Sequence, residues 1–109
     1  MVRGGTHLHG FSIPFEFEEI KEIYITYVQK DRVVLSKKTE DCVYDDSKRC
    51  VQVRLTQKDT LSFAKPGFNP MAEDSLVLIQ IRIILNNNNV CISYPIKERL
   101  YDVFDGGGV

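Results

Sequence analysis

The chain lacks tryptophan and has only three cysteines among its 109 residues. Those cysteines, Cys42, Cys50 and Cys91, form no Cys-x-x-Cys pair, which argues against a structural zinc site. Cys42 and Cys50 could face each other across a hairpin and form a disulfide. We expect three reduced thiols instead, because the sequence shows no secretion signal.

An excess of one charge is also missing, since 14 basic and 15 acidic residues leave a net charge of −1. This balance argues against nucleic-acid binding, which normally needs a basic patch. The N-terminal segment has no apolar core typical of a signal peptide. The longest apolar run, Ser75–Leu85, is too short to cross a membrane and contains Arg82. We therefore expect a chain that is made in the cytoplasm and binds neither membrane nor nucleic acid.

Residues 1–109 have the length of one domain, contain segments in which apolar and polar residues alternate, and show no internal repeat. The two ends are exceptions. Met1–Gly5 has two glycines and predicts a flexible N-terminal arm, and residues 105–109 predict a flexible Gly-rich tail.

The apolar run Ser75–Leu85 predicts the central strand of an antiparallel sheet. Its β-branched residues favour a strand over a helix. Alternate side chains of a strand point to opposite faces. One face of this strand is wholly aliphatic, and the other has a polar pair between apolar ends. The aliphatic face comprises Val77, Ile79, Ile81, Ile83 and Leu85.

Shorter alternating segments on both sides of this run predict the rest of the sheet structure. Pro14 predicts that the first strand lies at an edge, and Thr56 followed by Asp59 predicts a capped helical turn. Ile96–Phe104 could be a short helix or an extended segment. The other strands are expected in His7–Phe17, Glu22–Lys30, Val33–Lys37, Cys42–Tyr44, Cys50–Leu55 and Val90–Tyr94. We predict an all-β fold, an antiparallel β-sandwich or open barrel of six to seven strands.

The second face of the central strand is the candidate interaction site. If it is not simply exposed to solvent, a partner subunit covers it, because apolar patches and arginine are typical of protein interfaces. Its residues are Leu76, Leu78, Gln80, Arg82 and Ile84.

His7 and His9 are two residues apart and would point to one face of a strand. They could begin a metal site with Glu16 or Glu18 as a third ligand. A histidine pair near a loose terminus is more often polar surface, so we expect no metal and no cofactor. The acidic clusters lie in predicted turns beside lysines. We expect their carboxylates to be solvated and therefore predict no catalytic residues. Those clusters are Glu16, Glu18 and Glu19, then Glu40-Asp41, then Asp45-Asp46.

Several motifs together resemble small proteins encoded in the structural-gene clusters of phages and prophages of gut Firmicutes. The motifs cover most of residues 3–83. They are Arg3-Gly4-Gly5-Thr6-His7, Phe11-Ser12-Ile13-Pro14-Phe15, Ile23-Tyr24-Ile25-Thr26-Tyr27-Val28-Gln29, Val34-Leu35-Ser36-Lys37, Asp41-Cys42, Leu55-Thr56-Gln57-Lys58-Asp59-Thr60-Leu61 with Phe63, and Ile79-Gln80-Ile81-Arg82. The chain departs from this pattern at Asn86–Asn89, where the family's turn carries glycine.

The resemblance implies a non-enzymatic virion protein of the tail or baseplate, similar in layout to the N-terminal β domain of phage baseplate upper proteins. It implies assembly with itself or with other virion proteins, location in the host cytoplasm and then in the virion, and no small-molecule ligand. An alternative function is a carbohydrate- or receptor-binding module that stacks ligands on exposed tyrosines. The tyrosines considered are Tyr24, Tyr27, Tyr44 and Tyr94.

Overall fold

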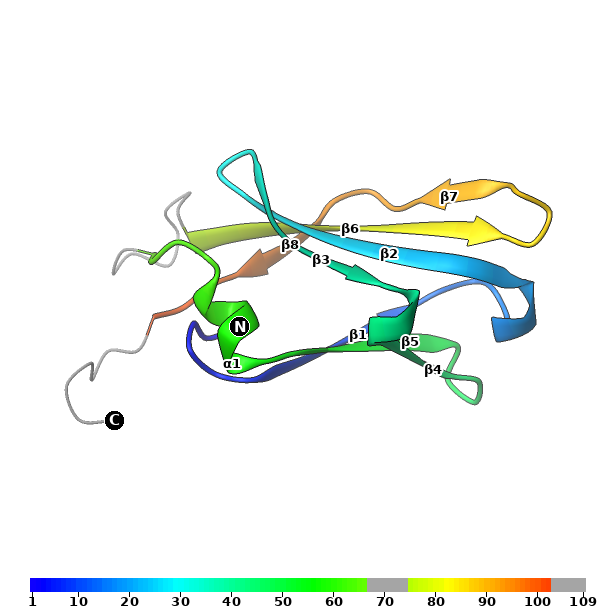
Figure 1. Cartoon of the computed structure of the whole chain (residues 1–109), viewed down its shortest axis with the longest axis horizontal. Coiled ribbons are helices and arrows are strands. Elements are labelled where there is room, and N and C mark those ends of the chain that lie inside the picture. Colours follow the sequence, from blue (N-terminus) through cyan, green and yellow to red (C-terminus); the bar gives the residue numbers. More distant parts are fainter. Residues whose placement is uncertain (67–74, 103–109) are drawn as a thin grey trace.

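The computed structural model describes residues 1–66 and 75–102, which form two antiparallel sheets packed face to face (Figure 1). The smaller sheet has the order β1 (His7–Ser12), β5 (Cys50–Leu55), β4 (Cys42–Asp45). The larger sheet contains β3 (Arg32–Lys38), β2 (Ile20–Gln29), β6 (Leu76–Leu85), β7 (Val90–Ile92) and β8 (Ile96–Arg99). The predicted β-sandwich is confirmed. The described residues form eight strands, and six to seven were expected.

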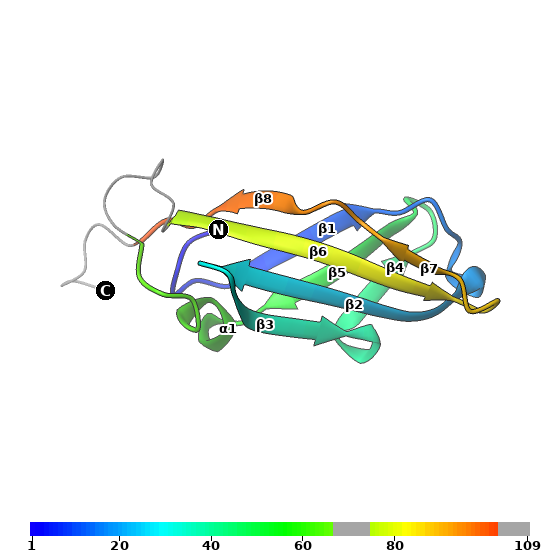
Figure 2. The ribbon, with the colours of Figure 1, turned by 90° about the horizontal axis from the view of Figure 1, so that it is seen from above.

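The run predicted as the central strand is β6, which pairs with β2 on one side and with β7 and β8 on the other (Figure 2). Its aliphatic parity faces the smaller sheet and is buried, except for the half-buried Leu85 at its end. Opposite it, the inward residues of β5 are also buried. Val51, Val53 and Leu55 supply this side of the core. The alternation of apolar and polar residues therefore determines which side chains of both sheets face the core.

The hairpin between β2 and β3 closes through the two residues Lys30 and Asp31. Both residues have positive φ angles, 52° and 61°. This left-handed backbone suits the right-handed twist of a two-residue hairpin, although it strains residues other than glycine. Asn88, in the asparagine turn after β6, likewise has a φ of 69°.

The helical turn predicted after β5 is α1 (Gln57–Leu61), and its capping box is formed. The Asp59 amide donates to the Thr56 hydroxyl, and the Thr56 amide donates to the Asp59 carboxylate. Two single 3-10 turns, η1 (Phe17–Glu19) and η2 (Thr39–Asp41), precede β2 and β4. No helix among the described residues combines the length and apolar character needed to cross a membrane.

Residues 1–5, expected as a flexible arm, contact the body of the domain. The Met1 side chain is buried, and the Arg3 amide donates to the Tyr101 carbonyl at 2.8 Å. The Arg3 guanidinium donates to the Phe63 carbonyl at 2.9 Å. The expected C-terminal tail lies outside the described residues.

Two alternatives left open by the sequence are settled by pairing. Ile96–Phe104 is extended at its start, where Ile96–Arg99 forms β8. Cys42 lies opposite Val53, whereas Cys50 lies opposite Asp45. The hairpin register therefore separates the two cysteines, and both thiols are free.

Candidate functional site

The predicted interaction face lies on the outside of the larger sheet. Gln80 and Arg82 are exposed, and their apolar neighbours on β6 are half-buried: Leu76, Leu78 and Ile84. The sequence therefore identified correctly which side of β6 faces away from the core. That a partner covers this side stays a prediction.

The structure extends this face onto the neighbouring strands. Cross-strand partners share a face, so Val90 opposite Ile84 and Ile92 opposite Arg82 lie beside the predicted residues. These two β7 side chains are 54% and 58% exposed. On the other side of β6, the Arg82 guanidinium lies 4.8 Å from the centre of the Tyr24 ring, a cation–π contact. We call this surface the outer face: Leu76, Leu78, Gln80, Arg82, Ile84, Val90, Ile92 and Tyr24.

A second feature is the open side of the sandwich, where β1 of the smaller sheet faces β7 and β8 of the larger one. A cleft of about 340 Å³ opens there with a largely apolar lining. Its walls include Phe11, Ile13, Ile81, Ile83 and Ile96. Neither β1 nor β7 has a further strand beside it among the described residues.

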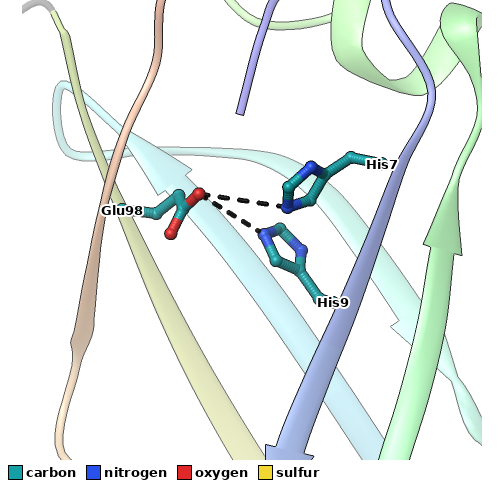
Figure 3. Close-up of side chains that lie close together, drawn as sticks. All are labelled: His7, His9 and Glu98. Atoms are coloured by element: carbon teal, nitrogen blue, oxygen red, sulfur yellow. Dashed lines mark ion pairs between the residues drawn. The ribbon is translucent and has the colours of Figure 1, made fainter.

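His7, His9 and Glu98 meet on the same open side (Figure 3). His7 and His9 both point inward from β1, and Glu98 reaches them from β8. The Glu98 Oε1 atom lies 4.0 Å from His7 Nε2 and 3.8 Å from His9 Nε2. The same oxygen accepts from the Met1 amino group at 3.1 Å. Among the described residues, this is the one cluster of three that could hold a metal ion.

A β-bulge turns Glu98 toward the histidines. Between the pairs Ile79–Ile96 and Arg82–Ile92, two residues of β6 face three residues, 93–95. An extra residue reverses which side chains point inward. In β7 the even-numbered side chains share the outer face with Arg82, whereas in β8 Glu98 pairs with the buried Val77. Glu98 therefore points between the sheets.

The His9 ring is buried inside the sandwich. It is only 7% exposed and stacks on Tyr27, with its Nδ1 atom 2.8 Å from the Tyr27 hydroxyl. Its Nε2 atom is buried and has no hydrogen-bond partner among the described residues. Burial lowers the pKa of His9 to about 4, and the charge of His7 acts in the same direction. The pKa of His7 is also lowered, first by burial and then by the Met1 ammonium.

This arrangement corrects the sequence-based view of the histidines. His9 is not surface but core, and the neighbouring carboxylate is Glu98. The two acids first considered are exposed, and Glu16 pairs instead with Arg49 at 3.1 Å. The signal for His9 was present in its parity, which it shares with Phe11 and Ile13.

The other residues considered from the sequence are dispersed. The acidic clusters are largely exposed, as solvated turns should be, with only Asp45 half-buried. Tyr27 is buried between the sheets, and Tyr24 and Tyr44 are half-buried on different sheets. Tyr94 is 93% exposed. The four tyrosines therefore do not form one exposed stacking surface.

The fold defines an all-β protein, an antiparallel β-sandwich with the outer face on its larger sheet and a histidine–glutamate cluster at its open side. No protein-family model matches the chain, and no curated protein matches its sequence.

Proposed function

We propose that the chain is a non-enzymatic structural protein of a phage or prophage particle, part of its tail or baseplate. It acts by contacting copies of itself or other virion proteins, first in the host cytoplasm and then in the virion. The observation that supports this proposal best is the outer face. There, exposed aliphatic side chains on an edge strand continue an apolar surface on the central strand.

The chemistry of the outer face is typical of a protein contact. Apolar side chains at both ends of β6 supply area whose burial is favourable, and Arg82 on Tyr24 supplies an anchor. β7 adds Val90 and Ile92 next to a strand edge that has no partner strand among the described residues, the kind of edge that soluble monomers usually protect with charges. A neighbouring subunit could cover this face and continue the sheet.

The sequence resemblance described above supports the same class of function, because it consists of strand and turn motifs and contains no catalytic signature. The histidine–glutamate cluster has no nucleophile among its members, and the tyrosines are dispersed. We therefore propose no second function.

A pair of matched variants tests the outer face. Ile92→Lys places a charge on it, whereas Val43→Lys does so on β4 of the other sheet, where the side chain is 66% exposed. Sedimentation velocity over a wide concentration range would measure self-association, alone and with the products of neighbouring structural genes. We expect Ile92→Lys to weaken association by at least about tenfold, since burying an unpaired charge is costly. Val43→Lys should associate like the wild type.

Two results would overturn the proposal. One is a wild-type chain that stays monomeric and binds none of those gene products. The other is equal behaviour of the two lysine variants, which would show that the outer face has no special part in assembly.

A further inference from the structure

The geometry points to a metal site: we propose that His7, His9 and Glu98 bind a divalent transition-metal ion of the Zn²⁺ class, which ties the two sheets together. Two imidazoles and one carboxylate are a ligand set that Zn²⁺ uses in proteins. The ion would be independent of the outer face, because the cluster lies between the sheets.

The separations suit an ion after small side-chain movements. The three ligand atoms lie within 4.8 Å of one another. Around a tetrahedral Zn²⁺, ligand atoms stand about 3.4 Å apart, given metal–ligand distances of about 2.1 Å. The two distances to Glu98 Oε1, 3.8 and 4.0 Å, exceed this spacing by about 0.4 and about 0.6 Å, and no separation in the cluster exceeds it by more than about 1.4 Å. The Met1 amino group donates to the same oxygen and must move away when the ion binds.

An independent observation is the orphaned Nε2 atom of His9. A buried polar atom without a partner is costly, and this one is aimed at Glu98 (Figure 3). A metal ion would supply the missing partner. In metal-binding histidines the ring nitrogen that does not bind the ion usually makes a hydrogen bond to a neighbouring group. In His9 that nitrogen is Nδ1, which lies 2.8 Å from the Tyr27 hydroxyl. When Nδ1–H donates to Tyr27, the Nε2 lone pair faces the ion.

The position of the ligands indicates what the ion would do. Two come from β1 in the smaller sheet and one from β8 in the larger sheet. These strands border the open side, where β1 and β8 are not paired with each other among the described residues, although a β-bridge between Val2 and Tyr101 joins the segments next to them. An ion there would act as a cross-link, and it would be lost if the bulge that turns Glu98 inward were removed.

Titration of the metal-free full chain with Zn²⁺, monitored by calorimetry, tests this site. We expect one Zn²⁺ per chain. Glu98→Gln and His7→Gln should each weaken binding by at least about tenfold, since loss of even an outer contact to a ligand costs about that much. Glu18→Gln is the matched control, an exposed glutamate near the histidines in sequence but outside the cluster, and should bind as the wild type does. Cys91→Ser controls for the exposed thiol.

Each outcome of the titration either supports the metal site or overturns it. Absence of Zn²⁺ binding, unchanged binding in Glu98→Gln and His7→Gln, or loss of binding in Cys91→Ser would each overturn the proposal. Circular dichroism checks that every variant is folded. The His7 side chain is one third exposed, so His7→Gln should fold even if Glu98→Gln does not. Histidine ring signals in NMR spectra should shift on Zn²⁺ addition in the wild type and in Glu18→Gln alike.

Discussion

The buried His9 imidazole should make the metal-free protein lose stability as the pH falls. Burial lowers the pKa of His9 to about 4, whereas the unfolded chain has the ordinary value of 6.5. Between these two values the unfolded chain binds a proton that the folded chain does not. The free energy of unfolding is therefore highest above pH 6.5 and falls progressively toward about pH 4. Two-state titration with these values gives a loss of about 2 kcal/mol between about pH 7 and about pH 5.

Urea unfolding at a series of pH values, with a chelator present, measures this loss. His9→Gln is the comparison, since it removes the titrating group, and His7 remains in both proteins. Asp45 and Asp59 have lowered pKa values, so their contributions are lost only below this range. We expect the wild type to lose about 2 kcal/mol more than His9→Gln between about pH 7 and about pH 5. Identical pH dependence in the two proteins would refute the argument from burial.

Three further changes test the fold itself by the free energy of unfolding in urea. Asp31→Gly should stabilise by about 0.5–1 kcal/mol, because glycine relieves the left-handed backbone at a φ of 61°; a loss of stability would argue against this turn. Thr56→Ala should cost about 1 kcal/mol by removing the cap that receives the Asp59 amide, and an unchanged midpoint would contradict the capping box. Ile79→Ala should cost about 2–5 kcal/mol, whereas Gln80→Ala on the exposed side should cost under about 1 kcal/mol; similar costs would mean that the faces of β6 are wrongly assigned.

Local patterns in the sequence predicted the elements whose environment is set by near neighbours. The alternation along β6 identified its buried side, because a strand in a sheet that packs on another sheet buries every second side chain. The Thr56–Asp59 cap is likewise complete within a few residues. These features need no knowledge of which strands pair.

The histidine–glutamate cluster could not be predicted in the same way. His9 and Glu98 are 89 positions apart in the sequence, and their approach depends on both sheets being assembled. The orientation of Glu98 also depends on the bulge opposite Gln80 and Ile81. Since one extra residue reverses the inward parity, the pattern Ile96–Arg99 alone could not show which side chains face the core.

The extent of the outer face could not be read from the alternation within single strands. Val90 and Ile92 lie in a segment of only three strand residues, and their place beside Ile84 and Arg82 follows from the register with β6. The sequence identified the row on β6 alone, because alternation within each strand does not fix the register of the hairpin that joins β6 to β7.

Quantitative mass spectrometry of purified particles tests most directly whether this chain is a virion component. The particles would come from a host strain whose phage or prophage encodes the chain. We predict that the chain is present at a fixed copy number relative to another tail protein and remains after washing at high salt. Intact, infectious particles that contain none of it would contradict the proposed function.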